Sequence, residues 1–206
     1  MLKLLGTPNT RTTRVTWALE EAGAEYEFVK IDLHRGGTRT PEYRALNPGA
    51  KVPTLLDGDQ AITESAAIVI HIAERYPEAG LIPTEPIARA RCLQWCFFTI
   101  GELEQPLWTM SKHSFALPPD WRTPAIMSTA AREWLRAAKV FSESLGDRQY
   151  ILGDDFSVAD IMLAHTLAWS IYAKQPTEHQ NLQAYAARVL SRPALARAQA
   201  REQAAK

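Results

Sequence analysis

The sequence of 206 residues has two cysteines, no long apolar run and no excess of either charge. Lysine plus arginine number 23 and aspartate plus glutamate number 23, so no global charge favours nucleic acid or an anionic membrane. No apolar run reaches the length of a membrane span, and the apolar start at residues 1–6 is too short for a signal peptide. We therefore expect no nucleic-acid partner and no membrane partner.

The two cysteines, Cys92 and Cys96, lie four residues apart in a helical pattern. This spacing places them on one helix face and does not give a dithiol redox motif. We expect buried thiols, which fit a reducing cytoplasm. The sequence has no metal-spaced set of histidines and cysteines, no P-loop and no dinucleotide glycine motif, so it predicts no metal site.

The stretch from Asn47 to Ile68 predicts a hairpin followed by a helix. Two short β-prone runs, 54–56 and 61–63, flank the turn residues Asp57 and Gly58. A helix is then expected from Ser65 to Tyr76, with Thr63 as its N-cap and Glu64 in its first turn.

This stretch has the chemistry to hold a peptide-like ligand. Free N–H groups at the helix start, together with the Ser65 hydroxyl, suit a carboxylate, and Glu64 suits a neighbouring ammonium. If the Val52–Pro53 bond were cis, the N–H and C=O of Val52 would pair with an extended peptide. The alternative stays open, because about nineteen in twenty such bonds are trans and a Glu-Ser helix start is usually only a cap.

The order of expected elements divides the chain into two domains. Residues 1–77 read as strand, helix, strand, short helix, hairpin and helix, which gives a four-stranded mixed sheet with helices on its faces. Residues 78–86 are rich in proline and serve as a linker, and residues 87–206 are all helical. The expected helices of the second domain are 88–111, with a kink or break at Pro106, then 125–145, a helix from 158 to about 171, 182–190 and 193–204. Ser157 to Asp160 forms a capping box, which we assign to folding.

Two sets of motifs resemble those of the cytosolic glutathione transferases. The first domain carries NPGAKVPTL, then Asp-Gly and then Thr-Glu-Ser at a helix start, and the second carries GDDFSVAD at residues 153–160. The resemblance implies a thioredoxin-like N-terminal domain (βαβ-α-ββα) that binds glutathione and an all-α domain that lines a pocket for an electrophile. It also implies a cis Val52–Pro53 bond, a homodimer, and glutathione contacts from Val52, Pro53, Glu64 and Ser65.

The reaction implied by the resemblance is attack of the glutathione thiolate on an electrophilic small molecule. A hydrogen-bond donor near the start of the first helix lowers the thiol pKa, and in this family it is usually tyrosine, serine or cysteine. Tyr26 lies in the second strand and no cysteine precedes Cys92, so the chain resembles the bacterial serine/threonine type. Thr10 is the first candidate for the donor and Asn9 the second.

Thr7 is a minor candidate, because the loop Thr7-Pro8-Asn9 is similar to that of some bacterial relatives but has a longer interval to the helix. For each threonine the alternative is a cap of the first helix.

Weaker candidates surround both expected pockets. His34 and Arg35 follow the second strand and Lys51 precedes Val52, where they would meet the glycine end of glutathione, although Arg35 and Lys51 suit solvated surface charges equally well. In the second domain the candidates for an apolar electrophile pocket are Trp108, Lys112, His113 and Phe115, which could also be core or rim residues.

The fold alone does not establish catalysis. A non-catalytic glutathione-transferase-like binding or regulatory protein, or a glutathione-dependent isomerase or lyase, therefore stays open beside the transferase.

Overall fold

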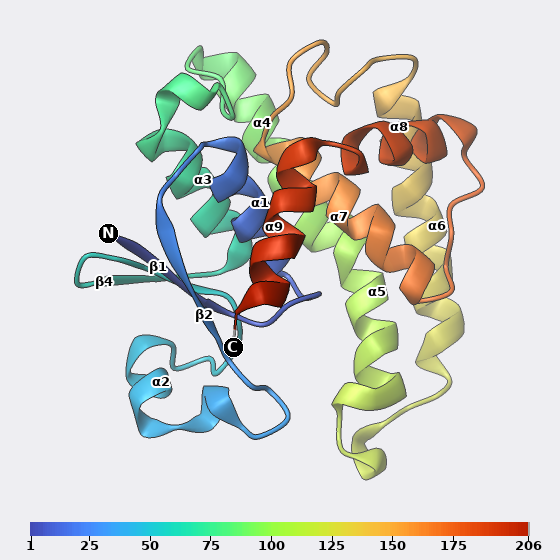
Figure 1. Ribbon diagram of the computed structural model, residues 1–206. Coiled ribbons are helices and arrows are strands. Elements are labelled where there is room, and N and C mark those ends of the chain that lie inside the picture. The colour runs from blue at the N-terminus through green and yellow to red at the C-terminus, as the bar shows by residue number, and fades with distance from the viewer. Residues whose placement is uncertain (206) are drawn as a thin grey trace. The chain divides into compact units, whose positions relative to one another are not determined.

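The computed structural model describes residues 1–205, and contacts divide these residues into two compact units. The first unit comprises residues 1–82 together with the segment from Ser191 onward, and the second comprises residues 83–190. The sequence analysis expects the last helix in the helical domain, whereas the contacts group it with the first unit. That helix packs along the first helix of the chain, so its contacts assign it to the first unit (Figure 1).

The first unit is an α/β structure built on one mixed sheet. Its elements are β1 (Leu2–Gly6), α1 (Thr12–Glu21), β2 (Tyr26–Lys30), a 3-10 turn η1 (Gly37–Arg39), α2 (Pro41–Leu46), β3 (Thr54–Asp57), β4 (Gln60–Thr63), α3 (Ser65–Arg75), a 3-10 turn η2 (Pro77–Ala79) and α9 (Pro193–Ala204). The strand order is β2-β1-β3-β4, with β1 parallel to β2 and antiparallel to β3. This confirms the predicted four-stranded mixed sheet and thioredoxin-like class.

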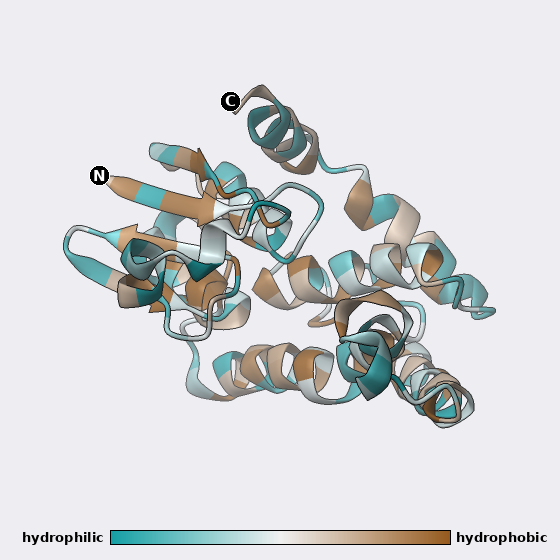
Figure 2. Cartoon of the chain, turned by 90° about the horizontal axis from the view of Figure 1, so that it is seen from below, coloured by the Kyte–Doolittle hydropathy of each residue, from teal (hydrophilic) through white to brown (hydrophobic). Residues whose placement is uncertain are grey.

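The core of this unit lies where helices α1 and α3 meet each other and the sheet. Strand β1 is apolar apart from Lys3, as the brown strand beside the N-terminus shows (Figure 2), and its Leu2 and Leu4 are buried. Trp17 of α1 and Ile68 of α3 are fully buried, and the two helices pack together. Each buried side chain of this size contributes about 1.5–3 kcal/mol relative to exposure, so the apolar spacing determines which helix faces turn inward.

The hairpin and the helix after it form where the sequence predicts them, with one correction. Asp57 and Gly58 turn between β3 and β4, and Gly58 has a positive φ of 60°. Thr63 does not cap α3. Glu64 occupies the N-cap position with φ 68° and ψ 114° and forms no side-chain capping bond. The N-cap of α3 therefore lies one residue later than the composition suggested.

The second unit is all helical apart from one isolated β-bridge between Tyr150 and Gly153. Its elements are α4 (Pro86–Phe98), a π-helical segment η3 (Thr99–Leu103), α5 (Glu104–Ser111), a second π-helical segment η4 (Lys112–Ala116), a 3-10 turn η5 (Pro119–Trp121), α6 (Ile126–Leu145), α7 (Val158–Tyr172) and α8 (Gln180–Leu190). Within residues 1–205 we find no helix with both the length and the apolar character that a bilayer crossing requires.

The second unit contains two local features that the sequence predicts. Pro106 lies in the first turn of α5, directly after the π-helical segment η3, and its missing N–H suits this interruption of regular helical bonding. The capping box at the start of α7 is present, with the Ser157 N–H donating to Asp160 at 2.9 Å. The fully buried Asp160 also accepts from the Ile151 N–H at 2.9 Å and the Tyr185 hydroxyl at 2.7 Å. It therefore joins the loop before α7 to α8.

Candidate functional site

The register of the sheet brings the predicted site segments to one end of the first unit. Leu5 pairs with Thr54, and Thr54 pairs with Thr63. Neighbouring strands lie about 4.8 Å apart, so the chain leaves β1, enters β3 and leaves β4 at the same edge of the sheet. Strand β2 ends there too, because Lys30 pairs with Gly6. The loop 7–10, the Val52–Pro53 step and the start of α3 therefore gather at this end.

Val52 presents main-chain groups that no residue of the described chain uses. Its bond to Pro53 is cis, as the resemblance implied. Neither its N–H nor its C=O takes part in a hydrogen bond within residues 1–205. The preceding residue is held firmly, since the carbonyl of Lys51 accepts from the Tyr43 hydroxyl at 2.6 Å and from Nδ2 of Asn47 at 2.9 Å. The unpaired groups of Val52 are thus presented by a fixed segment.

The start of α3 combines a helix N-terminus with a buried cation. The Ser65 side chain is buried and its Oγ accepts from Nη1 of Arg14 at 3.4 Å. Arg14 is fully buried, and sequence reasoning missed it because an arginine on a helix is usually read as a surface charge. The only signal available was its position within the apolar pattern of α1. Together, the guanidinium and the positive end of the helix favour an anion here.

Glu64, directly before Ser65, is exposed and has a positive φ of 68°. Such backbone conformations cost about 1–3 kcal/mol in a residue other than glycine and cluster at functional sites. Because Glu64 is exposed, its carboxylate lies in solvent next to the start of α3, which favours anions.

The loop between β1 and α1 separates the two donor candidates. The Thr10 hydroxyl is engaged locally, because it donates to the Thr7 carbonyl at 2.7 Å and accepts from the Thr12 N–H at 3.1 Å. Thr7 is engaged as well, donating to the Ile31 carbonyl at 2.6 Å. Asn9 is exposed, has φ 57°, and its side-chain amide forms no hydrogen bond in the described part of the chain. The threonines thus stabilise the loop, and Asn9 carries its exposed donor.

Glu202 of α9 is a second residue that sequence reasoning missed. Its side chain is buried, and its carboxylate accepts from the hydroxyl of Thr16 at 2.6 Å and from that of Thr13 at 3.1 Å. The Asn9 backbone N–H also donates to it. Burial raises the pKa of this carboxyl, and the three hydrogen bonds partly offset the rise. No local pattern reveals this contact, because 186 and 189 residues separate Glu202 from its hydroxyl partners.

The weaker candidates of the first unit are all exposed. His34 and Arg35 follow β2, where their N–H groups donate to the Asp32 carboxylate at 2.9 and 3.1 Å. These two hydrogen bonds, the one from Arg35 first, hold the pKa of Asp32 below its usual value. Lys51 precedes β3, so all three candidates lie at the same end of the sheet as the main site.

The electrophile candidates lie near one another in the second unit. Trp108 is on α5 and contacts the ring of Trp169 at 6.4 Å between centroids. Lys112, His113 and Phe115 follow in η4. His113 has a structural partner, since its Nδ1 accepts from the Thr123 N–H at 2.9 Å, and the ring of Phe115 is 70% exposed.

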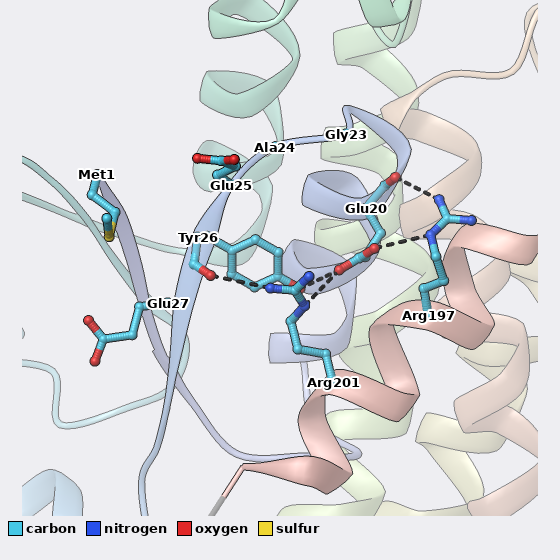
Figure 3. Close-up of a pocket in the computed structure, with 9 residues that line it drawn as sticks. All are labelled: Met1, Glu20, Gly23, Ala24, Glu25, Tyr26, Glu27, Arg197 and Arg201. Carbon is cyan, nitrogen blue, oxygen red and sulfur yellow. Dashed lines mark hydrogen bonds and ion pairs between the residues drawn. The ribbon is translucent and has the colours of Figure 1, made fainter.

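A hollow of about 680 Å³ in the first unit contains none of the predicted site residues. It is lined by Met1, Glu20, Gly23, Ala24, Glu25, Tyr26, Glu27, Arg197 and Arg201 (Figure 3). The two arginines that line it already form ion pairs within the protein. Arg197 and Arg201 pair with Glu20 at 3.1 and 2.9 Å. This network fastens α9 to α1.

The described residues hold neither a cluster of metal ligands nor an exposed thiol. No group of three or more histidine, cysteine or acidic side chains within residues 1–205 is arranged to hold a metal ion. Cys92 and Cys96 are both buried, as predicted. A hydrogen bond between the two thiols is the main cause that lowers the pKa of Cys92.

Comparison with known proteins identifies the family. The glutathione S-transferase N-terminal domain matches residues 1–74, and the C-terminal domain of the same family matches residues 78–188. The disulfide-bond oxidoreductase YfcG of Escherichia coli is 28% identical over 96% of this chain and 94% of its own. Glutathione S-transferase F10 of Arabidopsis thaliana is 32% identical over 74% of this chain and 72% of its own. A glutathione transferase homologue from Sulfitobacter, solved with bound glutathione, is 26% identical, with a TM-score of 0.82 over 96% of each chain. The chain therefore belongs to the glutathione S-transferase family.

Proposed function

We propose that this chain is a glutathione transferase that binds glutathione at the β1–β3–α3 end of the first unit and activates its thiolate. The observation that carries the proposal is the gathering, at one end of the sheet, of an unpaired peptide edge at Val52, a buried cation behind Ser65 and an exposed amide at Asn9. These three features match the backbone, the carboxylate and the thiol of one tripeptide.

The γ-glutamyl end of glutathione is proposed to bind at the start of α3. The Ser65 hydroxyl accepts from Arg14 and donates to no other group within residues 1–205, so its proton is available for the ligand's carboxylate. Glu64 is exposed next to it and suits the α-ammonium. The cysteinyl residue would pair with the main chain of Val52 beside Pro53, as an added strand does.

At the other end of the tripeptide, His34, Arg35 and Lys51 are proposed to meet the glycine carboxylate. All three are exposed, so this contribution to affinity is expected to be small.

The thiolate donor is proposed to be Asn9, with Thr10 holding the loop. The sequence analysis ranks Thr10 before Asn9 as the donor, and here we propose the opposite ranking. The Thr10 hydroxyl already forms hydrogen bonds with Thr7 and Thr12, whereas the Asn9 amide has no partner in the described chain. A thiol of pKa about 8.5 must become more acidic to react as the anion near neutrality. One hydrogen bond to a charged group supplies roughly 1.5–3 kcal/mol, which corresponds to about one to two pKa units. The chain thus belongs with relatives that use neither tyrosine nor cysteine at this point.

In the reaction, the sulfur anion forms a bond to an electrophilic carbon and the leaving group departs with its electron pair. Trp108, Lys112, His113 and Phe115 of the second unit are proposed to bind the electrophile, because the two exposed or half-buried rings suit an apolar or flat molecule. A homodimer in the cytoplasm completes the proposal and rests on the family alone.

A second candidate function is reduction of a disulfide by glutathione, which is favoured by the match to YfcG over nearly the full length of both chains. The same thiolate would attack one sulfur of the substrate disulfide, form a mixed disulfide and release the other sulfur as a thiolate. A second glutathione would then release the product thiol and leave oxidised glutathione. Both functions require the same bound and activated glutathione thiolate. They differ only in whether that thiolate attacks a carbon or a sulfur atom.

The proposal is tested by calorimetry with glutathione. Turnover assays then follow on aryl halides, epoxides, enones and a small-molecule disulfide. We expect wild type to bind and Ser65→Ala to bind roughly ten- to a hundredfold more weakly, because a hydrogen bond to a carboxylate is lost. Ser128→Ala, at an exposed serine of α6, is the matched control and should bind as wild type does. Absence of glutathione binding by wild type would refute the proposal. Binding without turnover on any substrate would favour a non-catalytic role.

A further inference from the structure

Helix α9 is joined to α1 by ion pairs and by the buried carboxylate of Glu202. Arg192, directly before α9, pairs with Glu21 at 2.6 Å. Arg197 and Arg201 of α9 converge on Glu20 (Figure 3). Arg201 also lies over the ring of Tyr26, 4.5 Å from its centroid. These contacts join α9 to α1 in addition to those of Glu202, whose partners are Thr13 and Thr16.

The contacts of Glu202 are with the start of α1 and the loop that precedes it. The side chain is only 2% exposed, and a carboxylate that is buried away from water must find donors. It finds them in the hydroxyls of Thr16 and Thr13, at 2.6 and 3.1 Å, and in the backbone N–H of Asn9. All of these donors lie at or next to the proposed site.

Asn9 has a backbone conformation that such a contact can stabilise. Its φ of 57° is in the left-handed region, which asparagine tolerates better than most residues but which is still uncommon. This backbone conformation sets the direction in which the Cα–Cβ bond of Asn9 leaves the chain. An acceptor placed at the backbone N–H of Asn9 therefore helps to determine where its side-chain amide lies.

We propose that Glu202 is a positioning residue that holds Asn9 in the orientation in which its amide reaches the glutathione sulfur. The inference rests on the proposed function, in which Asn9 is the thiolate donor. It adds a requirement that neither family match contains, because the matches cover residues 1–74 and 78–188 and Glu202 lies outside both. Glu202 touches no substrate atom in this scheme, so its effect must pass through the loop.

The test compares Glu202→Ala, Glu202→Gln and the control Gln203→Ala, whose side chain is exposed on the same helix. The pKa of bound glutathione is read, with the protein in saturating excess, from the ultraviolet absorbance of the thiolate as a function of pH. The affinity for glutathione is measured separately by calorimetric titration. We expect Glu202→Ala to raise the bound thiol pKa by roughly one unit and, because less of the thiol is then ionised, to lower kcat at neutral pH about threefold. Glutathione affinity, set by Val52, Glu64 and Ser65, should change less than about threefold.

Glu202→Gln keeps one acceptor oxygen and should recover most of the shift, whereas Gln203→Ala should match wild type. A lower Tm in Glu202→Ala with an unchanged thiol pKa would mean a purely structural role and would overturn the inference. If Glu202→Ala does not fold, Glu202→Asp withdraws the acceptor by one methylene, and an unchanged thiol pKa in that variant would overturn it equally.

The backbone amide signal of Asn9, followed by nuclear magnetic resonance without glutathione, separates this inference from the proposed function. If wild type binds no glutathione, the proposed function fails whatever the variants do. If wild type binds and activates glutathione but the Asn9 signal and the thiol pKa are the same in Glu202→Ala, only the positioning role fails. We expect the Asn9 signal to move in Glu202→Ala and to stay in place in Gln203→Ala.

Discussion

Replacing Asn9 by glycine isolates the contribution of its amide to thiolate formation. Glycine is the right substitute because Asn9 has φ 57°, a conformation that alanine adopts at a cost of about 1–2 kcal/mol and glycine adopts freely. The loop should therefore keep its path, held by the Thr10 hydroxyl on the Thr7 carbonyl. What is removed is one N–H donor that has no other partner within residues 1–205.

The magnitude follows from the strength of a hydrogen bond to an anion. A loss of about 1.5–3 kcal/mol corresponds to a rise of roughly one to two units in the pKa of the bound thiol. If the wild-type thiol has a pKa near 6.5, a rise of two units returns it to about 8.5, the value of a free thiol. The thiolate fraction at pH 7 would then fall from about three quarters to about one thirtieth. Turnover limited by thiolate attack should fall in the same proportion.

The assay is a pH titration of thiolate absorbance in the enzyme–glutathione complex, with kcat/KM measured over the same range. Thr10→Val serves as the comparison. It removes a hydroxyl that accepts from the Thr12 N–H, so it should lower stability by about 1 kcal/mol and leave the thiol pKa nearly unchanged. The opposite result, an unchanged pKa in Asn9→Gly and a raised one in Thr10→Val, would show that the hydroxyl is the donor and that the assignment to Asn9 is wrong.

Three further predictions concern buried groups. Asp160→Asn should lower the free energy of unfolding by about 1–3 kcal/mol in urea titrations, because the amide nitrogen that replaces one carboxylate oxygen must face a donor N–H; an unchanged midpoint would contradict this. The raised pKa of Glu202 means that its folded-state contribution is greatest below the unfolded value of 4.5 and is lost as pH rises through the folded pKa. The stability of wild type relative to Glu202→Gln should therefore fall as pH increases from about 4.5, and a difference that grows with pH would refute the sign. Cys92 and Cys96 are fully buried, so mass spectrometry should find neither alkylated until the protein unfolds, although the Cys92 pKa is lowered; rapid labelling of the native protein would contradict this.

The sequence was sufficient for features that depend on neighbouring residues. The turn at Asp57 and Gly58 and the capping box at Ser157 follow from the conformational preferences of a few adjacent residues. The gathering of the site also follows from local elements. Once three short strands are joined in the observed order, the pairing of Leu5 with Thr54 places their ends together.

Contacts between distant segments could not be predicted in this way. Arg14 has an ordinary position in the helical pattern, and only the arrival of α3 makes it a buried partner of Ser65. The choice between Asn9 and Thr10 has the same origin. Both residues carry a donor, and the decision depends on which donor the loop has already used.

The position of α9 changes what counts as the glutathione-binding unit. Residues 1–82 are continuous in sequence, yet α1 faces a helix that begins at Pro193. Without that helix, the hydroxyls of Thr13 and Thr16 lose a buried acceptor, and Glu20 and Glu21 lose the arginines that neutralise them. In the sequence, the second unit is therefore inserted between two segments of the first. The fragment 1–82 is consequently a poor substitute for the whole chain in a glutathione-binding experiment, because it lacks Glu202 of α9, which contacts the loop that carries Asn9.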